Sequence, residues 1–155
     1  MTDYVLLYAR LKGLYDGKAN TLSCLANTAA VLGTQIEDIS WAGFYLQDDE
    51  GLYLAPFYGE AACMNIKNGK GVCGTAAKTD KLQMVDDVSL YAGHIACSAK
   101  TRSEIVLPIH KNGKVVGVLD IDSESLARFT NADAQGLAEI VKLIEASLDF
   151  DIFKK

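Results

Sequence analysis

A cysteine and a carboxylate stand close together where an irregular stretch leads into a strand. Cys97 ends a segment of small residues, and Glu104 lies at the start of the apolar run that follows it. Reactive groups are usually found on loops at the rim of a rigid sheet, and a cysteine attacks as its thiolate. Residues 93–108 therefore predict a candidate nucleophile that shares a pocket with a carboxyl group.

Two further carboxylates alternate with apolar residues at 119–123. Asp120 and Asp122 fall on one face of a strand, because strand side chains alternate with a period of two. Like charges on one face of a hydrophobic strand repel each other, so such a pair is expected only where the charges have a function. The alternative is an acidic edge exposed to solvent.

An Asn-Gly turn at 112–113 joins the strands expected at 103–110 and 114–121. Asn-Gly favours a tight type I′ hairpin, which places the start of one strand beside the end of the other. We therefore expect Glu104, Asp120 and Asp122 to converge at one end of the sheet, next to Cys97.

Other polar candidates leave alternatives open. His94 is either a base for Cys97 or a hydrogen-bonded bystander, and a metal site made by Cys63, Cys97 and His94 is a third possibility for this region. Cys73 either packs under a helix or is a spare thiol, and Cys24 is expected to be buried. No Cys-x-x-Cys pair is present, and we predict neither a metal nor a cofactor.

The first half of the chain must position these groups. Helices are expected at 4–14 and 21–32, the second with Asn20 as its N-cap and Gly33 as its C-cap. A hairpin follows at 40–46 and 52–58, in which Trp41 and Tyr45 share a face as core residues or as an aromatic pocket wall. Residues 61–66, which include Cys63, are expected to form a short strand.

The second half of the chain completes an α+β architecture of layers. The glycines at 69–74 resemble a phosphate loop, but Thr75 stands where such a loop needs Lys, so a short helix is expected instead. A short strand at 82–85, the hairpin, and a last helix capped by Thr130 and Asp133 follow. The sequence thus predicts a single domain, 1–155, with a central antiparallel sheet and the N- and C-terminal helices on one face.

Composition narrows the class of protein. The chain has 155 residues, half of them hydrophobic, a net charge of -5 and no basic run, which argues against a nucleic-acid surface. No apolar stretch approaches the ~20 residues that span a membrane, and the first residues lack a signal-peptide pattern. We therefore expect a cytoplasmic protein whose cysteines are thiols, with any disulfide transient and catalytic.

Six segments, in order, closely resemble the free methionine-(R)-sulfoxide reductases, which are stand-alone GAF-domain enzymes. The segments are Trp-Ala-Gly-Phe-Tyr at 41–45, Ala-Cys at 62–63, Gly-Lys-Gly-Val-Cys-Gly-Thr-Ala at 69–76, Gly-His-Ile-Ala-Cys at 93–97, Ser-Glu-Ile-Val-Leu-Pro at 103–108 and Gly-Val-Leu-Asp-Ile-Asp-Ser at 117–123. The resemblance implies a GAF-like fold and the reduction of free methionine sulfoxide. We also expect a thioredoxin-type reductant as a partner, and a homodimer is a possibility.

The resemblance assigns roles to three thiols. It implies that Cys97 is the nucleophile, that Cys63 resolves the oxidised Cys97, and that Cys73 has a lesser or backup role. Members of the family often carry Asp directly after the nucleophile, where this chain has Ser98.

The resemblance also outlines the pocket. It implies that Glu104, Asp120 and Asp122 bind the substrate and donate a proton, and that Trp41 and Tyr45 form the aromatic wall for the methylsulfinyl group. Crowded carboxyl groups do not all ionise readily, so one can supply the proton while the others hold an ammonium. The alternative is a GAF module that senses a small ligand without catalysis.

Overall fold

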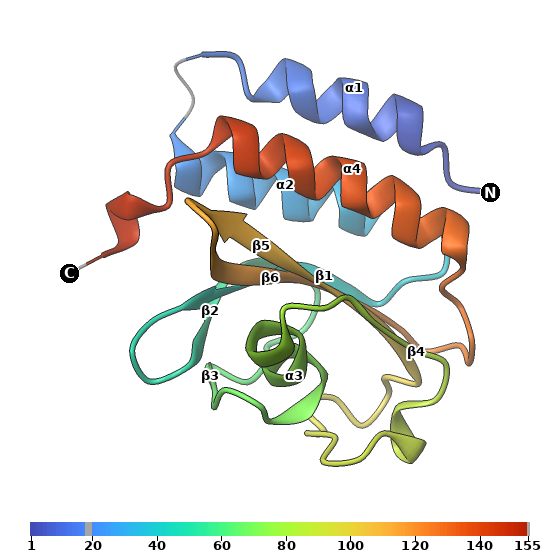
Figure 1. Cartoon of the computed structure of the whole chain (residues 1–155). Helices are drawn as coiled ribbons and strands as arrows, with labels where there is room; N and C mark the ends of the chain where they lie inside the picture. Colours follow the sequence, from blue (N-terminus) through green and yellow to red (C-terminus); the bar gives the residue numbers. More distant parts are fainter. Residues whose placement is uncertain (18–19, 155) are drawn as a thin grey trace.

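Helices cover both faces of one antiparallel sheet in the computed structural model, which describes residues 1–17 and 20–154. Three helices, α1 (Tyr4–Leu14), α2 (Thr21–Gln35) and α4 (Asn131–Ser147), lie on one face, and the short α3 (Gly71–Thr79) lies on the other (Figure 1). The expected α+β fold, with its terminal helices on one face, is confirmed. Lys155, the last residue of the expected domain, lies outside the described residues.

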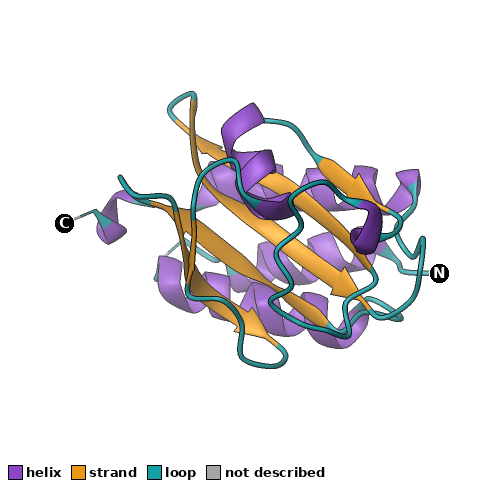
Figure 2. Cartoon of the chain, turned by 90° about the horizontal axis from the view of Figure 1, so that it is seen from below, coloured by secondary structure: helices purple, strands orange, loops and turns teal. Residues whose placement is uncertain are grey.

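The strands of the described chain lie between Trp41 and Ser123. They are β1 (Trp41–Gln47), β2 (Leu52–Tyr58), β3 (Asn65–Ile66), β4 (Gln83–Val85), β5 (Ser103–Lys111) and β6 (Lys114–Ser123), in the order β3-β2-β1-β6-β5-β4. Short 3₁₀ turns lie at Val88–Leu90 and Asp151–Phe153. In Figure 2, seen from the α3 side, loops cross this face of the sheet.

Strand alternation separates two apolar layers. In β1, Ala42, Phe44 and Leu46 pack toward α2, while Trp41 and Tyr45 face the α3 side. The same alternation in β5 and β6 sends the apolar residues at 105, 107, 109, 119 and 121 into the larger layer. The positions between them, which include all three carboxylates of the hairpin, therefore face α3.

Most of the expected boundaries agree with the structure, but the end of α2 does not. Asn20 caps α2, and Thr130 and Asp133 form a reciprocal capping box at the start of α4. Gly33, however, lies inside the last turn of α2, which ends at Gln35 and has Ile36 as its C-cap. A Cβ at position 33 would lie 2.2 Å from the ring of Tyr58, so this glycine serves the close approach of β2 rather than a cap.

The strand expected at 61–66 is also shorter than predicted. Only Asn65–Ile66 pairs with β2, and Cys63 lies in the preceding loop. The last ladder bond joins the N–H of Leu54 to the carbonyl of Met64 at 2.9 Å. The next pair along this ladder would need an N–H from Pro56, which proline lacks, so the chain leaves the sheet before Cys63.

The β5–β6 turn has the expected form. Asn112 and Gly113 both have positive φ, 52° and 76°, as a type I′ turn requires.

Among the described residues, the helices are too short or too polar to cross a membrane.

Candidate active site

A cavity of about 140 Å³ opens on the α3 side of the sheet. Strands β1, β5 and β6 form its floor, the first turn of α3 forms one wall, and the loops around residues 60–62 and 94–101 form its rim. Of the eight residues to which the family resemblance assigns a role, all but Cys63 line it: Trp41, Tyr45, Cys73, Cys97, Glu104, Asp120 and Asp122. The tertiary structure therefore forms one pocket from segments that lie far apart in the sequence.

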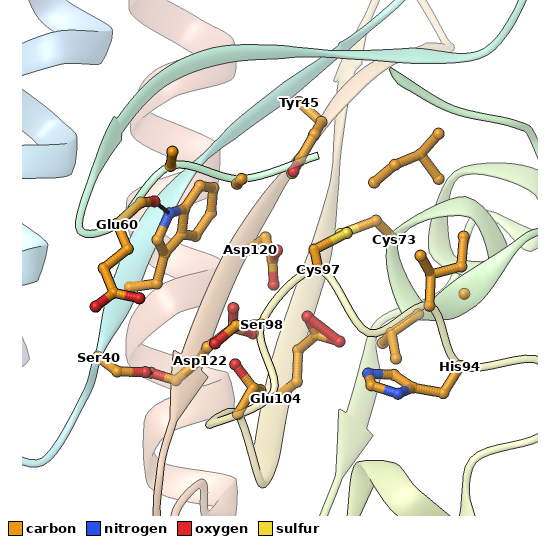
Figure 3. Close-up of a pocket in the computed structure, with 18 of the residues that line it drawn as sticks. Ser40, Tyr45, Glu60, Cys73, His94, Cys97, Ser98, Glu104, Asp120 and Asp122 are labelled. Atoms are coloured by element: carbon orange, nitrogen blue, oxygen red, sulfur yellow. Dashed lines mark hydrogen bonds between the residues drawn. The ribbon is translucent and has the colours of Figure 1, made fainter. Parts of the chain in front are cut away.

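Sheet register brings the three carboxylates together. Glu104 is the partner of Asp122 across β5 and β6, and Asp120 faces the same side two residues earlier. Figure 3 shows the three side chains gathered within the pocket. Glu104 and Asp120 are only 8% and 5% exposed, so the alternative of a solvated acidic edge is wrong.

Burial changes the proton affinity of this cluster. Loss of solvation, followed by repulsion from the neighbouring carboxylates, raises the pKa of Glu104 and of Asp122 well above the usual range. Burial raises the pKa of Asp120 as well, although hydrogen bonds from its neighbours oppose that rise. One oxygen each of Asp120 and Asp122 is buried without a hydrogen-bond partner. The pocket can therefore hold a proton and still offers oxygens to a cation.

Cys97 and Cys63 are joined in a disulfide at the rim of this pocket. Their Cα atoms are 5.5 Å apart, and 34 positions separate them in the sequence. Within the described residues, Cys24 and Cys73 are the free cysteines, and both are buried. The pairing expected between nucleophile and resolving cysteine is thus present, and in this state neither sulfur is a thiolate.

Cys73 has a position that the sequence did not reveal. It lies in the first turn of α3, and its sulfur is within 4.8 Å of carboxylate oxygens of Glu104 and Asp120. Burial, and then the charge of Asp120, raises the pKa of the Cys73 thiol well above its usual range. The thiol is therefore protonated, and its sulfur is part of the carboxylate cluster.

Trp41 and Tyr45 are core residues that also line the pocket, so the core alternative and the pocket-wall alternative both hold. Their rings stack at 6.0 Å, and Trp41 also stacks on Phe57 at 5.3 Å. A Cβ at Gly43 would lie 2.4 Å from the Cβ of Phe57 and 2.7 Å from the Trp41 ring, so only glycine leaves room for this stack. The aromatic pair lies beside the carboxylates, because Trp41 is the register partner of Asp122.

His94 lines the pocket and is drawn among its lining residues in Figure 3. Burial lowers its pKa, so the imidazole is neutral at pH 7. A metal set of Cys63, Cys97 and His94 does not exist in this state, because the two sulfurs are bonded to each other. A base role for His94 stays a prediction.

Lys100 and Arg102, the basic residues that follow Cys97 in the sequence, lie outside the acidic pocket. The ammonium of Lys100 pairs with Glu60 at 3.4 Å, both side chains being exposed, and Arg102 is exposed. The first turn of α3 lines the cavity instead, and its unpaired N–H groups contribute partial positive charge.

The cavity is also lined by three residues that no sequence pattern marked, which are Ser40, Glu60 and Glu124.

Comparison with known proteins places this site in a class. The GAF domain family matches residues 20–148. The chain is 45% identical over 152 residues to the Escherichia coli (strain K12) protein called free methionine-R-sulfoxide reductase, which covers 98% of this chain and 92% of that protein. The fold and the site thus define a GAF-domain protein.

Solved structures narrow the class further. The chain is 44% identical to a Staphylococcus aureus structure described as fRMsr in its reduced form, with a TM-score of 0.93 over 96% of this chain and 97% of that one. It is 40% identical to a free methionine-R-sulfoxide reductase from Neisseria meningitidis, solved in complex with its substrate, with a TM-score of 0.91 over 96% and 90% of the chains. The chain belongs to the family of free methionine-R-sulfoxide reductases.

Proposed function

We propose that this protein reduces free L-methionine-(R)-sulfoxide to methionine through a cysteine sulfenic acid and an intramolecular disulfide. One observation carries the proposal: the Cys97 segment lines the same cavity as the buried carboxyl groups of Glu104 and Asp120 and the partly buried one of Asp122. Relatives with substantial identity over nearly the whole chain are named for this activity. The pairing of Cys97 with Cys63 supports the chemistry.

In the first step, the Cys97 thiolate attacks the sulfur of the sulfoxide. The sulfoxide oxygen takes a proton and is transferred to Cys97, so that the substrate sulfur gains two electrons and Cys97 becomes a sulfenic acid. Glu104 is the proposed proton donor, because burial and its acidic neighbours raise its pKa. Methionine is then free to leave.

Binding of the free amino acid depends on charge. Asp120 and Asp122 each present a buried oxygen without a partner, which suits an ammonium group. Trp41 and Tyr45 supply an apolar wall for the methyl group. A methionine within a protein carries an uncharged amide nitrogen at this position, so the acidic pocket favours the free amino acid.

In the second step, Cys63 attacks the sulfenic acid sulfur of Cys97. The S–S bond forms, the S–O bond breaks, and the oxygen leaves as water. An external dithiol of the thioredoxin type then reopens the disulfide. Reopening in every cycle needs a reducing environment, and for this reason we propose a cytoplasmic location.

A ligand sensor would account for the GAF fold but gives no reason for a disulfide beside an acidic pocket. We therefore propose catalysis, within one domain spanning 1–155. The homodimer stays a prediction, which sedimentation of the reduced and oxidised protein would check.

The decisive experiment offers the two sulfoxide epimers of free methionine separately. Protein, thioredoxin, thioredoxin reductase and NADPH are mixed with each epimer, and NADPH consumption and methionine are measured. We expect consumption with the R epimer only, and none with Cys97→Ser. Equal rates with both epimers would contradict the stereochemical assignment, and no methionine from either epimer would contradict the function.

A further inference from the structure

Trp41 and Tyr45 make backbone contacts that substrate binding does not require. The hydroxyl of Tyr45 donates a hydrogen bond to the carbonyl of Cys63 at 2.8 Å. The indole N–H of Trp41 donates to the carbonyl of Glu60 at 3.0 Å, the dashed line beside Glu60 in Figure 3. Both aromatic residues belong to β1, which pairs with a strand on each side. The centre of the sheet therefore holds the backbone that carries Cys63.

These side-chain contacts replace a missing part of the sheet. The β2–β3 ladder ends at the bond between Leu54 and Met64, since Pro56 has no N–H to continue it. Beyond that point the Cys63 carbonyl accepts from Tyr45. Tyr45 is 2% exposed, and burial, followed by the charge of Asp120, raises the pKa of its phenol, so the hydroxyl keeps its proton.

The Cys97 side of the disulfide is held differently. Among the described residues, the backbone N–H groups of 93–101 donate only to acceptors two or three positions away: His94 to Tyr91, Cys97 to Ile95 and Lys100 to Ser98. The ion pair of Lys100 with Glu60 is exposed and contributes little. The Cys63 backbone is thus anchored to the sheet, whereas the Cys97 loop is tied mainly to itself.

We propose that Tyr45 is a positioning residue for disulfide formation. Its hydroxyl holds the Cys63 backbone where the Cys63 sulfur meets the oxidised Cys97 as the Cys97 loop approaches. In that step the Cys63 sulfur bonds to the Cys97 sulfur, the S–O bond of the sulfenic acid breaks, and the hydroxide leaves as water with the proton of the Cys63 thiol. The inference rests on the proposed function and extends it to a residue that acts through Cys63.

A change that removes only the hydroxyl tests this role. Tyr45→Phe keeps the ring and leaves the Cys63 carbonyl without its donor. A hydrogen bond of this kind contributes a net stabilisation that corresponds to about a three- to tenfold effect on a rate. We expect the rate constant of disulfide formation, divided by that of methionine release, to fall by about that factor.

Both rate constants come from one single-turnover experiment. Fully reduced protein is mixed with L-methionine-(R)-sulfoxide without reductant and quenched over time. Released methionine reports the first step, while dimedone-reactive sulfenic acid and the Cys63–Cys97 disulfide, quantified by mass spectrometry, report the second. In Tyr45→Phe the sulfenic acid should accumulate to a higher level and persist longer than in the unaltered protein.

Two further variants separate positioning from general destabilisation. Tyr15→Phe removes another buried hydroxyl, which is hydrogen-bonded to Thr28 in the larger core on the opposite face of the sheet. This variant should leave the ratio of the two rate constants unchanged. Placing 4-aminophenylalanine at position 45 restores an N–H donor and should restore the ratio. This second variant also keeps the test decisive if Tyr45→Phe folds poorly.

Each outcome bears on one proposal or on both. An unchanged ratio in a Tyr45→Phe protein that releases methionine would overturn the positioning role alone. Equal slowing of both steps would also overturn it, because a purely structural or substrate-binding role would explain such a result. If the unaltered protein releases no methionine, both this inference and the proposed function fail.

Discussion

Replacing Asp122 by Asn should make the substrate-free protein more stable at neutral pH while weakening its activity. The carboxyl group is partly buried beside Glu104 and Asp120, and one of its oxygens has no hydrogen-bond partner. Loss of solvation, and then the charge of Asp120, raises its pKa well above the ordinary 3.8. Asn has nearly the same shape, carries no charge, and can donate to its acidic neighbours.

The pH dependence gives the size of the effect. A carboxyl group whose pKa is higher in the folded chain stabilises the fold fully below its unfolded pKa, and this contribution is lost as pH rises through the folded pKa. While the folded protein holds one proton more than the unfolded chain, the free energy of unfolding falls by about 1.4 kcal/mol per pH unit. Over the pH range in which Asp122 keeps its proton in the folded chain but loses it in the unfolded chain, Asp122→Asn should gain about 1.4 kcal/mol per pH unit relative to the unaltered protein, and its Tm should rise accordingly.

Thermal unfolding of the reduced, substrate-free proteins measures this difference. The control is Asp49→Asn, which changes an exposed carboxylate in the turn between β1 and β2. The difference in Tm between this control and the unaltered protein should not change with pH. Asp122→Asn should also raise the KM for free methionine sulfoxide, because it removes a charge facing the ammonium. Parallel Tm curves for Asp122→Asn and the unaltered protein would refute the buried, protonated cluster.

Four further predictions test the site. Cys97→Ser should produce no methionine while keeping its circular dichroism spectrum, and turnover by this folded variant would remove Cys97 from the role of nucleophile. N-acetyl-methionine sulfoxide should show a kcat/KM about 10- to 100-fold below that of the free amino acid, because it loses a charge-assisted hydrogen bond, whereas equal efficiencies would refute an ammonium site. Glu104→Gln should lower kcat by about a hundredfold or more with a smaller change in KM, and an unchanged kcat would exclude Glu104 as proton donor. Gly43→Ala should cost about 1 to 3 kcal/mol in chemical denaturation and raise KM, because the new Cβ meets Phe57 and the Trp41 ring, and an unaffected variant would show that the stack adjusts without cost.

Local patterns predicted much of the fold. The alternation of apolar and acidic residues at 119–123 correctly placed Asp120 and Asp122 on one face, and the Asn-Gly turn correctly placed Glu104 beside them. The prediction failed where a distant segment decided the outcome. Gly33 does not end α2 but lies where the ring of Tyr58 packs closely against the helix. Cys63 is not in a strand, because Pro56 ends the ladder on the neighbouring strand.

The sequence by itself determined which groups face the same side of the sheet, since residue spacing along a strand fixes the direction of each side chain. It also carried the six segments that resemble the reductase family. Only the tertiary structure decided that the carboxylates are buried, that the Cys73 thiol joins them from α3, and that Tyr45 holds the Cys63 carbonyl. Burial and contacts between distant segments depend on how loops close and layers pack over the sheet, and no local spacing encodes those distances.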